Sequence, residues 1–187
     1  EASQDYENAR NTVAKFINAA DDQLIFTRST TESINMVAQG WLRSRLNRDD
    51  PVWVTRMEHH ANYLPWQALC NESGAELKII ELKADGSLDL DNCSGLYDAT
   101  TKLIAVTHVS NVLGVINPIK EICAKAAEQG IAVMVDAAQS AGHLPVDVID
   151  LDCDFLSFSA HKMFGPTGVG ALYGKVERLD EMEPLLL

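Results

Sequence analysis

The stretch IAVMVD, residues 131–136, decides the fold. Gly130 precedes it, five apolar residues follow in a row, and the sixth is an aspartate. A short, uninterrupted apolar run bounded by a turn residue is typical of a strand that is buried on both faces of a parallel sheet. The sequence therefore predicts a central strand whose last residue, Asp136, emerges at the carboxyl end of the strand.

Other short apolar segments alternate with helical patterns on both sides of this strand. Asn117-Pro118 predicts the start of a helix that Gly130 ends, with asparagine as its cap and proline in its first turn. Further upstream, Ser29-Thr30-Thr31-Glu32 indicates a capping box that opens a helix over 34–42. The remaining predicted elements are strands over 24–26, 52–54, 77–82, 103–106, 155–158 and 169–173, and helices over 6–17 and 64–71.

The order of these elements indicates one α/β domain. Strands that alternate with helices form a mostly parallel sheet covered by helices on both faces. We therefore expect a three-layer α/β/α fold with about seven strands. Glu1 enters a helical pattern at once and Leu185–Leu187 end the sequence on three apolar residues, so we also expect the chain to be a fragment of a longer protein.

Composition excludes several classes of partner. The formal net charge of −12 argues against binding to nucleic acid or to anionic membrane surfaces, which both require clustered lysine and arginine. No apolar run approaches the roughly 20 residues that a membrane span requires. The four cysteines form no C-x-x-C pair, so we interpret them as reduced structural thiols of a cytoplasmic protein.

Polar and ionisable residues follow the predicted strands at the point where each strand ends. In sheets of this kind, ligands bind beyond the carboxyl ends of the strands, and a purely structural sheet has no need of such groups there. The residues are Ser29, Thr30 and Thr31 after the first strand; Glu58, His59, His60 and Asn62 after the second; and, after later strands, His108, Ser110, Asn111, Asp136, Gln139, Ser159, His161 and Lys162.

Two of these motifs have both a structural and a functional interpretation. Ser29-Thr30-Thr31 at a helix start is either an ordinary N-cap or a phosphate pocket built from free backbone N–H groups. Asp136 is either a helix cap or the partner of a cation, since a carboxylate at the end of a buried strand needs one. His59 and His60 have no third ligand at a suitable spacing, so no metal site is predicted.

Lys162 lies in an apolar and aromatic setting, FSAHKMFGP at residues 158–166. Only a neutral amine forms a Schiff base, and an apolar setting favours the neutral form. A phosphate pocket, a buried carboxylate and a reactive lysine together match the phosphate, the ring nitrogen and the aldehyde of pyridoxal 5′-phosphate. That cofactor is the one we predict.

The same motifs resemble the class V aminotransferase family, and within it the SUF-type cysteine desulfurase and selenocysteine lyase branch. The resemblance covers nearly the whole chain. It is carried by TRSTTESIN at 27–35, EHHAN at 58–62, PWQ at 65–67, VSNVLG at 109–114, DAAQ at 136–139, SAHK at 159–162 and GPTGVG at 165–170. It implies the large domain of a pyridoxal-phosphate-dependent transferase of fold type I over residues 1–187. The N-terminal segment and the small C-terminal domain of the family would then lie outside this sequence.

The resemblance also implies a role for each site residue. Lys162 would carry the cofactor and move the substrate Cα proton, with His59 on the cofactor ring as an acid or base. Asp136 would pair with the ring nitrogen, Gln139 would bond the phenolic oxygen, and Asn111 would lie near the ring. The phosphate would be held by Thr30, Thr31, Ser159 and His161. Many members have glycine where Ser29, Ala137 and Ala160 stand, which are changes between small residues.

The activity implied is conversion of L-cysteine to L-alanine, with sulfur passed to a protein cysteine as a persulfide for iron-sulfur cluster assembly. A homodimer and a sulfur-acceptor protein are the implied partners. The family's nucleophilic cysteine and its carboxylate-binding arginine lie beyond residue 187, so none of the four cysteines is predicted to be that nucleophile. The alternatives are another class V reaction (selenocysteine lyase, transaminase or β-lyase) and a truncated, non-catalytic homologue that acts as a binding partner.

Overall fold

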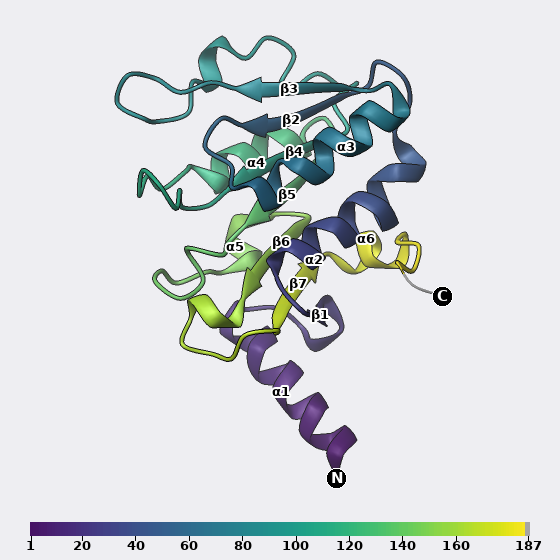
Figure 1. Ribbon diagram of the computed structural model, residues 1–187, viewed down its shortest axis with the longest axis vertical. Coiled ribbons are helices and arrows are strands. Elements are labelled where there is room, and N and C mark those ends of the chain that lie inside the picture. The colour runs from purple at the N-terminus through teal and green to yellow at the C-terminus, as the bar shows by residue number, and fades with distance from the viewer. Residues whose placement is uncertain (186–187) are drawn as a thin grey trace.

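A computed structural model describes residues 1–185, which form a seven-stranded sheet between helices (Figure 1). The strand order is β1-β7-β6-β5-β4-β2-β3. β7 is antiparallel to β1 and β6, while β6, β5, β4, β2 and β3 are parallel to one another. The strands are β1 (Leu24–Thr27), β2 (Pro51–Thr55), β3 (Glu76–Ile80), β4 (Leu103–Thr107), β5 (Ala132–Asp136), β6 (Phe155–Ser159) and β7 (Gly170–Gly174).

The helices lie on both sides of this sheet. In Figure 1 the strands descend from β3 at the top to β1 near the bottom, and α1 extends from there to the N-terminus. The helices are α1 (Ala2–Phe16), α2 (Thr30–Met36), α3 (Leu64–Ser73), α4 (Ile119–Ala127), α5 (Val148–Leu151) and α6 (Val176–Asp180). α2 continues without a break as a wider helical turn, Val37–Leu42. No helix within residues 1–185 is long and apolar enough to cross a membrane.

The core consists of two apolar layers, one on each face of the sheet. Along β5, Val133 and Val135 face the layer that contains α4 residues such as Ile122. Ala132 and Met134 face the opposite layer, which contains Ile34 of α2. Successive strand residues point to opposite faces, so β5 is buried on both sides, as its apolar sequence predicts. The three-layer α/β/α fold with a mostly parallel sheet is confirmed.

Two local predictions are wrong. Asn117 does not cap α4: its NH₂ group donates to the Thr107 carbonyl (2.7 Å), its Oδ1 accepts no hydrogen bond within residues 1–185, and the N-cap residue is Pro118. The predicted strand over 77–82 ends at Ile80, and Leu82 forms only an isolated bridge with Leu88. In the terminal apolar run of the sequence, Leu186 and Leu187 lie outside the described residues.

Gly170 brings three polar segments together at one edge of the sheet. In the register of the sheet, Gly170 lies between Thr27 of β1 and Ser159 of β6. A Cβ atom at this glycine would lie 2.7 Å from the Cα and carbonyl carbon of Ser29. Only a residue without a side chain therefore allows the start of α2 to lie directly against β7.

We predict that Gly170→Ala destabilises the protein by about 1–3 kcal/mol, because the added methyl group forces the Ser29 backbone to move. Thermal and urea unfolding of the purified variant measures this loss. Gly130→Ala is the control: its Cβ meets nothing within 4 Å, so its cost comes only from the φ of 70°. An unchanged unfolding temperature for Gly170→Ala would show that the contact with Ser29 is not tight.

Candidate active site at the carboxyl edge of the sheet

The start of α2 and the end of β6 are joined by buried polar contacts. The Thr30 N–H donates to Ser159 Oγ (2.8 Å), and the two hydroxyl groups are also 2.8 Å apart. Ser29 caps α2 by accepting from the Glu32 N–H (3.3 Å). The Glu32 carboxylate in turn accepts from the Arg28 N–H (2.6 Å), one residue earlier than a capping box requires. This edge of the sheet therefore presents helix N–H groups and hydroxyl groups, which suit an anion.

The two other predicted phosphate ligands are exposed near these contacts. Thr31 lies in the first turn of α2, and His161 lies in the 3₁₀ turn Ala160–Lys162 that follows β6. Thr31 also lines a hollow of about 480 Å³ together with Ser29 and Asn35. The structure thus brings Thr30 and Ser159 into contact and leaves Thr31 and His161 accessible from outside.

Asp136 ends β5 in the interior, with only 4% of its surface exposed. Its carboxylate accepts one hydrogen bond, from the Ala138 N–H (2.9 Å). Burial raises the pKa of Asp136 above its usual range, against the opposing effects of that N–H group and of the nearby Lys162 and His59 side chains. No regular α-helix begins between Asp136 and α5, but the bond from the Ala138 N–H is of the kind that a cap residue makes at the turns that follow β5. The carboxylate is matched to a cation that would enter the site.

Lys162 is partly buried at the end of the 3₁₀ turn after β6. Within residues 1–185 its Nζ has neither a hydrogen-bond nor an ion-pair partner. Lys162 is near enough to Asp136 to oppose the effect of burial on the pKa of that carboxyl group. A lysine without a structural partner beside a buried carboxylate is free to react with a ligand.

His59, Asn111 and Gln139 line two hollows that share Asn111. One hollow of about 470 Å³ contains His59 and Asn111, and another of about 500 Å³ contains Asn111 and Gln139. His59 Nδ1 accepts from the Ala61 N–H (3.1 Å). Because that nitrogen accepts a hydrogen bond, the ring proton of a neutral His59 lies on Nε2. His59 thus presents an N–H donor rather than a basic nitrogen at its outer end.

Glu58 is a site residue to which the sequence assigned no role. Its carboxyl group accepts from the Thr55 hydroxyl (2.6 Å), the Asn62 amide (2.6 Å) and the Thr107 N–H (2.7 Å). Burial raises the pKa of Glu58 to about 8, with a further contribution from the Asp136 charge. A glutamate three residues beyond a buried strand, with Asn62 four residues later, was the available signal in the sequence.

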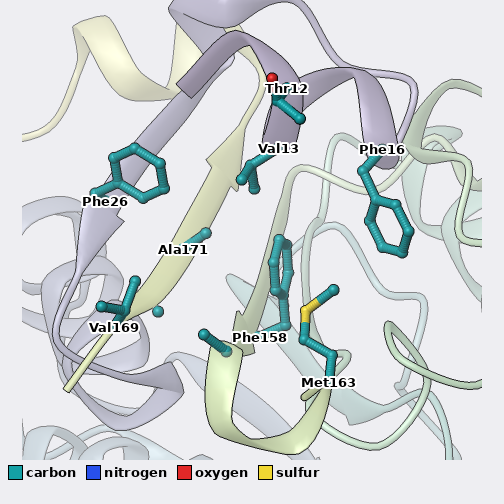
Figure 2. Close-up of a pocket in the computed structure, with 10 residues that line it drawn as sticks. Thr12, Val13, Phe16, Phe26, Phe158, Met163, Val169 and Ala171 are labelled. Carbon is teal, nitrogen blue, oxygen red and sulfur yellow. The ribbon is translucent and has the colours of Figure 1, made fainter. Parts of the chain in front are cut away.

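A separate apolar hollow lies between α1 and the strands β6 and β7. Its volume is about 240 Å³, and Figure 2 shows Val13 and Phe16 of α1 facing Phe26, Phe158 and Met163. Its lining contains no charged side chain. This hollow therefore has none of the groups needed for the chemistry expected at the carboxyl edge.

The cysteines lie in surroundings that disfavour the thiolate. Cys70, Cys123 and Cys153 are buried and Cys93 is partly buried. Burial raises the pKa of Cys70 to about 11 and that of Cys123 to about 12, and it also raises the pKa values of Cys93 and Cys153. Within residues 1–185, no three His, Cys, Asp or Glu side chains are grouped so that they could hold a metal ion.

Comparison with known proteins identifies the family. The model of the aminotransferase class-V family matches residues 1–187. The chain belongs to the class-V aminotransferase family. Members of this family use pyridoxal phosphate. The α/β fold predicted from the resemblance to this family is the fold that the structure has.

Several relatives of this class-V chain carry the name cysteine desulfurase. One from Enterobacter sp. (strain 638) is 50% identical over 185 residues, which are 98% of this chain and 46% of the relative. The cysteine desulfurase CsdA from Escherichia coli superimposes with a TM-score of 0.95 at 43% identity, over 99% of this chain and 47% of that protein. A cysteine desulfurase from Thermococcus onnurineus NA1 superimposes with a TM-score of 0.91 at 45% identity, over 100% of this chain and 46% of that protein. The chain spans about half the length of these relatives.

We predict that the stability of this class-V chain without cofactor falls as the pH rises. The pKa of Glu58 in the folded protein is about 8, against an ordinary 4.5. Its contribution to stability is therefore fully present below about pH 4.5 and is lost as the pH rises through about 8. The raised pKa of Asp136 acts with the same sign.

Urea unfolding between about pH 5 and about pH 9 measures this effect, which for Glu58 is at most about 1.4 kcal/mol per pH unit. The slope should be shallower in Glu58→Gln, which cannot ionise. Identical slopes in the two proteins would mean that Glu58 is already ionised at pH 5.

Proposed function

We propose that this chain is the cofactor-binding large domain of a pyridoxal-phosphate-dependent cysteine desulfurase, which converts L-cysteine to L-alanine. The observation that carries the proposal is the buried carboxylate of Asp136, which accepts one hydrogen bond, from the Ala138 backbone, and ends a strand at the edge where Lys162 and His59 also follow strands. The names of the relatives support the choice of cysteine among class-V substrates. In this proposal the other half of the protein supplies the nucleophilic cysteine and the arginine that binds the substrate carboxylate.

The residues at the carboxyl edge fit pyridoxal phosphate. Thr30 and Ser159 would hold its phosphate, together with the exposed Thr31 and His161. Asp136 would meet its ring nitrogen, where a protonated nitrogen would compensate for the buried negative charge. Lys162, which has no structural partner among residues 1–185, would carry it covalently. When bound, the cofactor supplies an aldehyde that condenses with amines and a ring that withdraws electrons from the substrate Cα.

The chain's own residues then divide the remaining work. The Lys162 amine would move the proton of the substrate Cα, because within residues 1–185 it has no hydrogen-bond or ion-pair partner and it is near Asp136. The His59 ring would cover one face of the cofactor and present its Nε2–H as a donor, since Nδ1 accepts from the Ala61 N–H. Gln139 and Asn111 would contact the phenolic oxygen and the region near the substrate carboxylate. The two hollows that share Asn111 give room for them to do so.

The sulfur chemistry requires partners beyond this chain. A thiolate must attack the substrate sulfur, and the thiols described here are buried or partly buried and have raised pKa values. We propose that the complete protein is a homodimer and that it passes its persulfide to a sulfur-acceptor protein, for use in iron-sulfur cluster assembly.

We predict that borohydride reduction of the complete protein with bound pyridoxal phosphate fixes the cofactor to Lys162. Lys162 has the free amine beside Asp136, whereas Lys175 is paired with Asp152 (2.6 Å). Peptide mapping by mass spectrometry locates the label, and Lys162→Arg is the negative control because it keeps the charge without a reactive amine. A label on Lys175 or on any other lysine would refute the assignment.

We also predict that residues 1–187 alone release no alanine from cysteine, even with pyridoxal phosphate and a reductant present. The reason is that none of the four thiols combines exposure with a low pKa, which an attacking sulfur requires. Assays of alanine and sulfide with the isolated chain and the complete protein test this. Catalytic alanine formation by the isolated chain, lost when one of its cysteines is replaced by serine, would place the nucleophile within this chain.

A further inference from the structure

Glu58 connects three backbone segments at the entrance of the candidate site. It lies in the turn between β2 and the 3₁₀ turn His60–Asn62. One carboxyl oxygen, Oε1, accepts from the Thr55 hydroxyl at the end of β2 and from the Thr107 N–H at the end of β4. The other, Oε2, accepts from the Asn62 amide. No cofactor contact is assigned to this side chain.

The bond to Thr107 takes the place of a strand partner. β2 and β4 pair in register only as far as Val54 and Ala105, so the Thr107 N–H has no partner from the β2 backbone. A buried backbone N–H without a partner is costly. The Glu58 carboxyl group satisfies it and thereby fixes the turn after β2 against the end of β4.

This bond links the two residues that are expected to meet the cofactor ring from different sides. Glu58 is followed directly by His59, and Thr107 is paired in register with Asp136 of β5. The position of the His59 ring relative to Asp136 is thus set through one carboxyl group. We propose that Glu58 is a positioning residue: it holds the turn that carries His59 at the distance from Asp136 that the cofactor ring requires. This proposal rests on the proposed function.

An amide cannot replace the carboxyl group in this network. Asn62 Oδ1 accepts from Trp66 Nε1 (3.1 Å), so its NH₂ group must point toward Glu58. In Glu58→Gln, the new NH₂ group would face either the Asn62 NH₂ group or the Thr107 N–H, and one donor would lose its acceptor. Combining it with Asn62→Asp removes the conflict, because the amide introduced at position 58 then donates to the carboxylate introduced at position 62, which still accepts from Trp66. This exchange keeps every hydrogen bond and moves the carboxylate from one side chain to the other.

The test uses the complete protein with pyridoxal phosphate. For wild type, Glu58→Gln and the exchange variant Glu58→Gln/Asn62→Asp, we would measure cofactor affinity and the visible circular dichroism of the bound cofactor, which reports how its ring is held. We expect Glu58→Gln to bind about tenfold more weakly, equivalent to about 1.4 kcal/mol, and to give an altered dichroism band. The exchange variant should return both quantities to within about twofold of wild type. The unfolding temperature without cofactor, measured in parallel, records the purely structural effect.

Glu81→Gln is the matched control. Glu81 lies just after β3 and pairs with Arg56 on the surface, so the same chemical change there should leave affinity and dichroism unaltered. The proposal is overturned if Glu58→Gln keeps wild-type affinity and dichroism, or if the exchange variant stays as impaired as the single variant. Should Glu58→Gln fail to fold, the exchange variant alone decides by the same criteria. Absence of cofactor binding by wild type would instead refute the proposed function.

Discussion

The carboxylate of Asp136 is placed where its charge is costly, at the end of a strand that is covered on both faces. β5 lies between β4 and β6 in the sheet, with Val135 packed in one apolar layer and Met134 in the other. Among the residues that the structure describes, only the Ala138 N–H donates a hydrogen bond to this carboxylate. A charge in that setting is stable when a cation meets it directly. The rest of the edge is arranged around this requirement, with Lys162 and His59 near the carboxylate and the Thr30–Ser159 contacts at a neighbouring strand end.

The topology of the sheet explains how distant residues meet there. Parallel strands bring their carboxyl ends to one edge of the sheet. The residues that follow β2, β4, β5 and β6 therefore lie at the same edge, although they are far apart in the sequence. β7 runs the other way, and its first residue therefore lies at the same edge as the last residue of β6. The lack of a side chain at Gly170 then allows α2 to begin against β7. The position proposed for the phosphate thus depends on packing between β7 and α2, as well as on the polar sequence 29–31.

The sequence predicted those features that depend on local pattern. Apolar runs such as 131–135 predicted the strands. Polar residues placed just after each strand predicted that the site forms at the carboxyl edge of the sheet. It failed where the outcome depends on contacts between distant segments. The Asn117 side chain donates its NH₂ group to the Thr107 carbonyl at the end of β4, and its Oδ1, the atom that would cap α4, accepts no hydrogen bond in the described part of the chain. The role of Glu58 likewise depends on Thr107, which lies 49 positions away, so the local pattern over residues 58–62 marks Glu58 as a candidate but does not reveal this contact.

The most direct test of the account is whether the ring nitrogen of the cofactor is what Asp136 requires. The measurement is the affinity of the complete protein for pyridoxal phosphate and for its 1-deaza analogue, in which carbon replaces that nitrogen, with wild type and Asp136→Asn. If Asp136 pairs with the ring nitrogen, wild type should bind pyridoxal phosphate at least about tenfold more tightly than the analogue, and Asp136→Asn should lose this preference. Equal affinity of wild type for the two compounds would contradict it.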